Sequence, residues 1–166
     1  MGVRGATVKR GWGIRRAGFW NPAAAVDFVV LDAGDRHRRR IMLKGGQGTE
    51  FLLDLDEAVA LRDGDGIMLD DGAVVLVAGQ AEPLAEIATR TRLALVRLAW
   101  HIGNRHTDVQ IVGDKLRIRR DHVLEEMAGG LGATVTPVEA PFDPEAGAPH
   151  GHRHGHEHHR EKQHGG

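Results

Sequence analysis

The sequence predicts an N-terminal all-β domain, then a ferredoxin-like βαββαβ domain, and finally a disordered histidine-rich tail. Three observations support this prediction. Short apolar runs separated by glycine-rich turns fill residues 1–79, whereas helical patterns with start and stop signals occur within residues 80–140. From 141 to 166, proline, glycine, alanine and histidine dominate, and no apolar periodicity is left that could bury a core.

The N-terminal half is expected to consist of strands and turns. Apolar runs predict strands at residues 25–32, 36–44 and 49–55. Turn-forming residues follow these runs at 33–35, 45–48 and 62–66. Residues 66–79 have the pattern of a hairpin, in which Asp71 and Gly72 suit a type I′ turn.

A basic cluster lies within the second of these predicted strands. Because strand side chains alternate between two faces, Arg36, Arg38 and Arg40 would share one face of the strand. We interpret this cluster as a solvated face. Docking of an acidic partner is the alternative interpretation.

The first elements of the second domain follow a linker at residues 80–83. A strand is predicted at 84–90, and Thr91 can cap a helix that runs to about Ile102. Gly103 and Asn104 would stop this helix, since both residue types tolerate the left-handed backbone conformation.

The remaining elements of this domain are a hairpin, a helix and a strand. The hairpin is predicted at 107–120, around Gly113 and Asp114. Asp121 can cap a helix over 122–132, and the last strand is expected at 133–139. The resulting βαββαβ order is the ferredoxin-like arrangement, with two helices on one face of a four-stranded sheet.

Composition excludes several classes of function. The sequence contains no cysteine, serine or tyrosine, which excludes disulfides, thiolate metal sites and serine or cysteine nucleophiles. A formal net charge of -1 and an aromatic content of 4% argue against nucleic acid or anionic membrane as partners. No apolar segment resembles a signal peptide, so a cytoplasmic protein is expected.

Histidines are concentrated near the end of the chain, where seven of the eleven lie between His150 and His164. Several imidazoles on a flexible segment can bind one nickel, copper or zinc ion. Irregular spacing, with Arg153 and Glu157 between the histidines, favours a native metal-binding tail, although an engineered tag or an inert tail is the alternative. The candidate ligands are His150, His152, His154, His156, His158 and His159.

Two further candidate ligands are His101 and His106. On a continuous helix, a separation of five residues would place them roughly 140° apart, so they would not bind one ion from the same face. We therefore expect His101 to end the first helix and His106 to stand at the head of the next strand. The alternatives are a histidine favoured by the helix dipole at 101 and an ordinary surface histidine at 106.

The motifs together resemble the UreE family of urease accessory proteins, which are nickel metallochaperones. In the second half, "HIGNRH" (101–106) is followed by "DVQI" (108–111), and residues 119–148 continue the match up to the histidine-rich end. In the first half, "GDRHRRRIML" (34–43) and residues 61–87 agree with the same family.

This resemblance implies a homodimer in which each protomer has two domains. The N-terminal domain would be an interaction domain that resembles peptide-binding domains, and the C-terminal domain would bind metal. It implies that His106 lies at the dimer interface and shares a nickel ion with its symmetry mate. It also implies secondary ligands at His101 and His122. Arg120 replaces a further ligand of some family members and Thr89 replaces a cysteine, which puts these secondary sites in doubt.

The function implied is delivery of Ni(II) to the urease active site, without catalysis by the protein itself. Its partners would be the accessory GTPase of urease maturation and, through it, the other accessory proteins with apo-urease. Cu(II) and Zn(II) are expected to bind in vitro as well. Storage or detoxification of nickel or zinc by the tail alone is the alternative; a metal-dependent hydrolase is disfavoured because the sequence has no HExxH motif.

Overall fold

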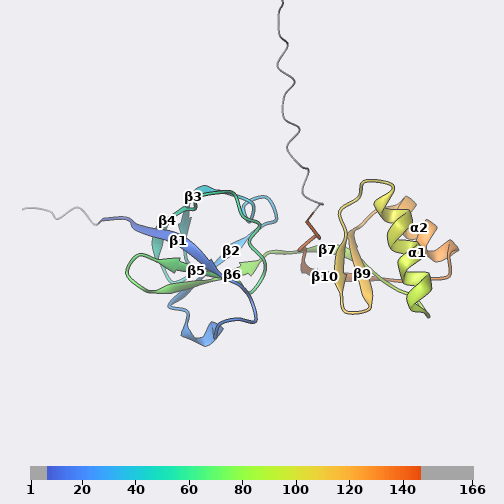
Figure 1. Ribbon diagram of the computed structural model, residues 1–166, viewed down its shortest axis with the longest axis horizontal. Coiled ribbons are helices and arrows are strands. Elements are labelled where there is room, and N and C mark those ends of the chain that lie inside the picture. The colour runs from blue at the N-terminus through green and yellow to red at the C-terminus, as the bar shows by residue number, and fades with distance from the viewer. Residues whose placement is uncertain (1–6, 147–166) are drawn as a thin grey trace, which may run out of the picture.

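The computed structural model describes residues 7–146, which form two sheets and two α-helices (Figure 1). The six histidines proposed as tail ligands, at positions 150–159, lie outside these described residues. Within the described residues, neither helix is long and apolar enough to cross a membrane.

The N-terminal part of the chain forms one six-stranded sheet with the order β2-β6-β5-β1-β4-β3. The pairs β1/β4 and β2/β6 are parallel and the other pairs are antiparallel. A single turn of 3-10 helix, Pro22–Ala24, follows β1. The strands are β1 (Lys9–Arg15), β2 (Asp27–Leu31), β3 (Arg40–Lys44), β4 (Glu50–Asp54), β5 (Gly66–Leu69) and β6 (Val74–Gly79).

Alternation along β2 shows how this sheet forms its core. Asp27, Val29 and Leu31 are buried, whereas the intervening Phe28 and Val30 are exposed, as expected for a strand with one covered face. A cluster of buried apolar side chains forms the core of this domain, made of Val29, Leu31, Leu43, Phe51, Leu53, Leu55, Leu61, Ile67, Leu69, Val75 and Val77.

The sequence pattern did not reveal β1. Its glycines at positions 11 and 13 remove the apolar alternation that would have predicted a strand. The structure explains Gly11, because a Cβ there would lie 2.7 Å from the Ile67 side chain. Gly11 therefore permits close contact between the backbone of β1 and the core.

The strand predicted at 36–44 is wrong in its first half. A turn occupies residues 33–36, stabilised by the Asp35 N–H, which donates to the Asp32 carboxylate at 2.7 Å, and β3 begins only at Arg40. Arg38 and Arg40 are exposed as predicted, but Arg36 is only 3% exposed. The predicted solvated face of three arginines is therefore wrong at Arg36.

The hairpin between β5 and β6 is confirmed, but its turn is not of type I′. A type I′ turn needs positive φ at both central residues, and of Asp71 and Gly72 only Gly72 has it, with φ of 85°. The Gly72 N–H donates to the carbonyl of Leu69 at 3.0 Å. The connection is thus a turn over residues 69–72, with glycine at its left-handed position.

Asp27 joins β2 to the turn that connects β3 and β4. Its carboxylate accepts N–H groups from Phe28 at 2.7 Å, Gln47 at 2.9 Å and Thr49 at 2.9 Å. Burial by itself would raise the pKa of Asp27, but these donors outweigh it and lower the pKa from 3.8 to about 2.

The ionised form of Asp27 should therefore stabilise the fold above about pH 4, and this contribution should be lost as pH falls toward 2. We expect Asp27→Asn to lower the free energy of unfolding at neutral pH and to flatten its decline between pH 4 and 2. Urea unfolding across this range is the measurement, with the exposed Asp114→Asn as control. An equal acid slope in both variants would contradict this role.

The second half of the chain has the predicted βαββαβ order (Figure 1). Its four strands are antiparallel to their neighbours, in the order β10-β7-β9-β8, and both helices lie on one side of the sheet. The elements are β7 (Ala81–Ala88), α1 (Arg92–Gly103), β8 (Gln110–Val112), β9 (Lys115–Arg119), α2 (His122–Gly130) and β10 (Thr134–Pro141).

Both predicted helix caps are confirmed. The Thr91 hydroxyl accepts the Ala94 N–H at 3.1 Å, and the Asp121 carboxylate accepts the Leu124 N–H at 2.9 Å. The helices bury a second core against the sheet, made of Ala85, Ile87, Leu98, Ile102, Leu116, Ile118, Leu124 and Ala128.

Two predicted boundaries are wrong. The linker expected at 80–83 is mostly strand, because β7 begins at Ala81. The disordered tail expected from 141 does not begin there, since Pro141 ends β10 and pairs with Ala81, and the next residue, Phe142, is fully buried. The Arg119 guanidinium lies 4.7 Å from the centroid of the Phe142 ring. The chain is therefore buried or half-buried from Pro141 to Pro144, shortly before the described part ends at residue 146.

Candidate metal centre

The residues Gly103 to His106 form a turn that continues from the end of α1. The N–H groups of Asn104, Arg105 and His106 donate to the carbonyls of Trp100, Ile102 and Gly103, each at 3.0 Å. His106 is therefore not at the head of the next strand, as predicted, because β8 begins only at Gln110.

The left-handed residue of this turn is His106 itself. Asn104, predicted to tolerate this conformation, has φ of -63°, whereas His106 has φ of 55°, the only positive value outside glycine among residues 7–146. This conformation costs an L-residue about 1–2 kcal/mol, and such strain is concentrated at functional sites. The turn holds the His106 side chain in an exposed position.

His101 lies in the last turn of α1 and is half-buried. Its ring meets the Trp100 ring edge to face, with 5.0 Å between the centroids. A histidine at this place is also favoured by the helix dipole. In the part of the chain that the structure describes, no three histidine or acidic side chains are arranged to hold a metal ion.

His122 and Arg120 lie at the start of α2. His122 is exposed, with its Nε2 3.5 Å from the Glu126 carboxylate. Arg120 binds both oxygens of Glu125, at 2.7 and 3.1 Å, which raises the pKa of Arg120 and lowers that of Glu125. Arg120 is thus engaged in a local ion pair that holds the start of the helix.

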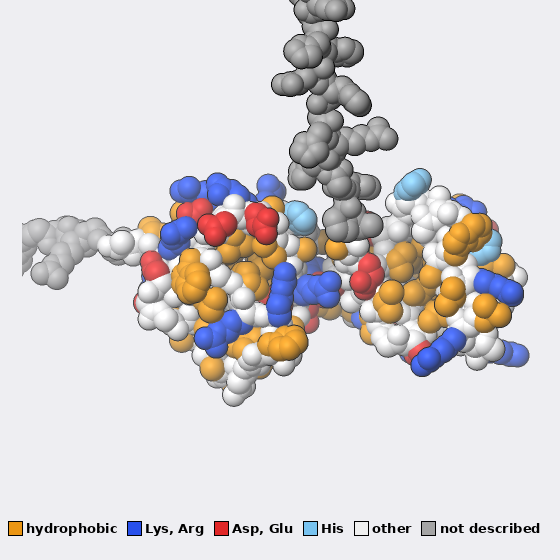
Figure 2. Space-filling view, viewed as in Figure 1, with side chains coloured by type: hydrophobic (Ala, Val, Ile, Leu, Met, Phe, Trp, Pro, Cys, Tyr) orange, Lys and Arg blue, Asp and Glu red, His pale blue; other side chains and the backbone are white. Residues whose placement is uncertain are grey.

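α1 carries a second apolar face, which the sequence pattern did not distinguish from the core face. Leu98 and Ile102 are buried, whereas Leu93, Val96 and Trp100 are exposed, the last by 64%. The three exposed residues, which we call the α1 stripe, are spaced at i, i+3 and i+7 and so share one side of the helix. They belong to the hydrophobic surface of the C-terminal domain, part of which is visible in Figure 2.

The segment after β10 lies beside β8, close in the chain to His106. The Asp143 N–H donates to Gln110 Oε1 at 3.2 Å, and the Glu145 N–H donates to the Val109 carbonyl at 2.7 Å. Val109 is separated from His106 by only two residues. The fold therefore holds residues 143–145, which precede the histidine-rich segment in the chain, beside Val109 and Gln110, three and four residues after His106.

The described residues form an all-β domain joined to a ferredoxin-like domain, with an exposed histidine after the first helix of the second domain, and these features define a class of two-domain protein. Family models describe the same division. Residues 13–79 match the N-terminal domain and residues 82–166 the C-terminal domain of the UreE urease accessory protein. The chain belongs to the UreE urease accessory protein family.

Individual relatives agree with this assignment. The chain is 59% identical to the urease accessory protein UreE of Rhodopseudomonas palustris (strain BisB18), over 129 residues that cover 78% of this chain and 61% of that protein. It is 50% identical to the same-named protein of Chelativorans sp. (strain BNC1), over 82% of this chain and 87% of that protein. The chain thus spans about three fifths of the first relative's length. Membership of a family of accessory proteins confirms the expectation that the chain is not an enzyme.

Proposed function

We propose that the protein binds Ni(II) and delivers it for assembly of the urease active site. Two His106 side chains, one from each protomer of a homodimer, share the ion, and histidines of the tail complete its ligand set. The observation that carries this proposal is the position of His106, exposed in a left-handed turn after α1 and three residues before Val109, which binds the segment that leads to the tail.

The α1 stripe supports the dimer. A side of a helix with exposed leucine, valine and tryptophan gains free energy when a partner covers it. A two-fold axis beside this stripe would place the same residues of both protomers opposite each other. A single histidine near that axis is thereby doubled, which turns one weak ligand into a pair.

Chain length supports a contribution from the tail. Four residues lie between Glu145 and His150, so these two residues are at most about 18 Å apart in an extended chain. Val109, which binds Glu145, is three residues from His106, at most about 11 Å away. His150 and the histidines beyond it can therefore reach the nickel at a high effective concentration.

An exposed site of this kind suits delivery. Imidazole ligands bind Ni(II), Cu(II) and Zn(II), so the choice of metal in the cell would follow from metal supply and from partners. We propose the accessory GTPase of urease maturation as the direct partner and, through it, the other accessory proteins with apo-urease. Nucleic acid and membranes are not proposed as partners.

A second candidate function is storage or detoxification of nickel or zinc by the tail alone. It is favoured by one observation, that residues 7–146 contain no preformed cluster of three ligands. The two functions differ in whether His106 is needed for tight binding, and this difference can be measured.

Calorimetric titration with nickel of three proteins distinguishes these functions: the full chain, a chain ending at Pro149, and that shorter chain with His106→Asn. Asparagine is chosen because it tolerates positive φ, so that only the imidazole is lost. We expect the shorter chain to keep one tight site per dimer. Losing a residue that only hydrogen-bonds to a metal ligand typically lowers metal affinity by about 10- to 100-fold. Because His106 is proposed as a ligand itself, His106→Asn should lower the nickel affinity of this site by more than about 100-fold.

His37→Asn in the same shorter chain serves as the matched control, because His37 is an exposed histidine of the N-terminal domain. It should leave the affinity of the tight site unchanged. Loss of all binding on removal of the tail would instead establish the storage function and exclude a shared site at His106.

A further inference from the structure

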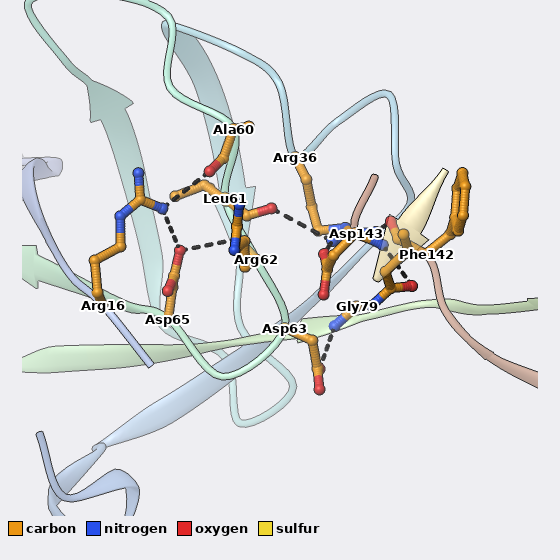
Figure 3. Close-up of polar contacts among 11 residues, drawn as sticks. Arg16, Arg36, Ala60, Leu61, Arg62, Asp63, Asp65, Gly79, Phe142 and Asp143 are labelled. Atoms are coloured by element: carbon orange, nitrogen blue, oxygen red, sulfur yellow. Dashed lines mark hydrogen bonds and ion pairs between the residues drawn. The ribbon is translucent and has the colours of Figure 1, made fainter. Parts of the chain in front are cut away.

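A buried arginine crosses the junction between the two sheets. Arg36 belongs to the N-terminal domain, since its N–H donates to the Asp32 carbonyl at 3.0 Å and its carbonyl accepts the Leu61 N–H at 2.8 Å. Its side chain nevertheless extends to the segment that follows β10 (Figure 3).

The Arg36 guanidinium has partners in both parts of the chain. Nη1 donates to the Leu61 carbonyl at 3.3 Å and to the Asp143 carboxylate, and Nη2 donates to the Phe142 carbonyl at 2.6 Å (Figure 3). The Asp143 side chain is itself mostly buried. Breaking a buried ion pair by removing one partner is strongly destabilising, because the other charge is left uncompensated.

One donor of this arginine has no partner among residues 7–146. Arg36 Nε is buried without a hydrogen bond to any described atom. An unsatisfied buried donor has a desolvation cost, so the guanidinium depends on its remaining contacts. These contacts place the Asp143 carboxylate and the Phe142 carbonyl at a defined position relative to the N-terminal domain.

The same segment is held on its other side by the C-terminal domain. Asp143 and Glu145 donate backbone N–H groups to Gln110 and Val109, and Phe142 is buried against Arg119. A continuous set of contacts therefore runs from Arg36 through residues 142–145 to the start of β8, just beyond His106.

A second close contact reinforces this junction. The Gly79 N–H donates to the Asp63 carboxylate at 2.8 Å, and a Cβ on Gly79 would lie 2.7 Å from the Cβ of Pro141 (Figure 3). The ends of β6 and β10 thus approach each other so closely that only glycine fits at position 79. Arg36 acts within a packed junction and not in isolation.

We propose that Arg36 is a positioning residue that fixes the origin of the histidine-rich tail beside the His106 turn. Through this one side chain, the N-terminal domain determines where the tail begins. An effect of Arg36 on nickel affinity depends on the proposed nickel site. The positioning of residues 142–145 by Arg36 does not depend on that site.

Hydrogen exchange in the full-length protein without metal tests the positioning. We expect Arg36→Met to speed exchange of the N–H groups of residues 143 and 145 by at least about 10-fold, with α1 unaffected. Asp143→Asn should have the same effect from the other side of the ion pair and provides a second test if Arg36→Met folds poorly. Arg38→Met, an exposed residue of the same loop, is the control. Unchanged exchange at residues 143 and 145 in both variants would overturn the proposal.

Nickel titration then tests the consequence for the tail. With the natural Arg36, the full chain should bind nickel more tightly than the chain ending at Pro149. We expect this advantage in nickel affinity to fall several-fold when Arg36→Met is introduced into both chains. An unchanged ratio would overturn the role of Arg36 in positioning the tail. If His106→Asn proves to have no effect on nickel, the proposed function fails, while the exchange experiment still decides whether Arg36 positions the segment.

Discussion

Replacing Trp100 with glutamate is expected to convert the proposed homodimer into monomers, with a dimer dissociation constant raised at least about 100-fold. Trp100 is the largest side chain of the α1 stripe and is 64% exposed in the single chain. If the stripe is buried in the dimer, Trp100→Glu would place a charge in an apolar interface, where it has no partner. The monomer itself should stay folded, because the buried face of α1 is carried by Leu98 and Ile102.

Sedimentation velocity over a range of protein concentrations measures this change. Trp12→Glu is the matched control, since Trp12 is 54% exposed but belongs to β1 of the N-terminal domain. We expect the control to stay dimeric. Dissociation by Trp12→Glu and not by Trp100→Glu would show that the protomers meet through their N-terminal domains, and it would remove the reason for a nickel ion shared at His106.

Phe142→Ala is expected to lower the free energy of unfolding by about 3 kcal/mol or more. The ring is fully buried and lies beneath the Arg119 guanidinium, so its removal would leave a cavity and expose the Arg36 contacts at the junction. This is a large effect for a residue that composition alone assigned to a disordered tail.

Urea unfolding, followed by circular dichroism, measures the loss. Phe19→Ala provides the control, because Phe19 is 88% exposed and its truncation should change the free energy of unfolding by less than about 0.5 kcal/mol. Equal effects of the two substitutions would show that residues 142–146 are not packed in solution.

Local signals in the sequence predicted most of the C-terminal domain. The caps at Thr91 and Asp121 each depend on a side chain that accepts an N–H group three residues ahead. The turn at Gly113 likewise depends on the conformational freedom of one residue, with φ of 60°. Such interactions are complete within a few residues, so the pattern of residue types is enough to predict them.

Features that depend on distant partners were missed or misplaced. β1 could not be predicted because Gly11 and Gly13 are explained only by the close approach of the Ile67 and Met68 side chains. Arg36 was interpreted as solvated because its neighbours in the sequence are arginines, whereas the carboxylate that binds it, that of Asp143, lies 107 residues further along the chain. No local pattern contains that information.

The sequence by itself determined the secondary-structure order of the C-terminal domain, and the resemblance it carries identified the candidate ligand His106 and the histidines near the end of the chain. Only the tertiary structure decided that His106 occupies a left-handed turn after α1, that the α1 stripe is exposed, and that residues 142–145 are held next to β8. The physical reason is that imidazole chemistry belongs to a residue type, whereas a position in space depends on contacts between residues far apart in the chain.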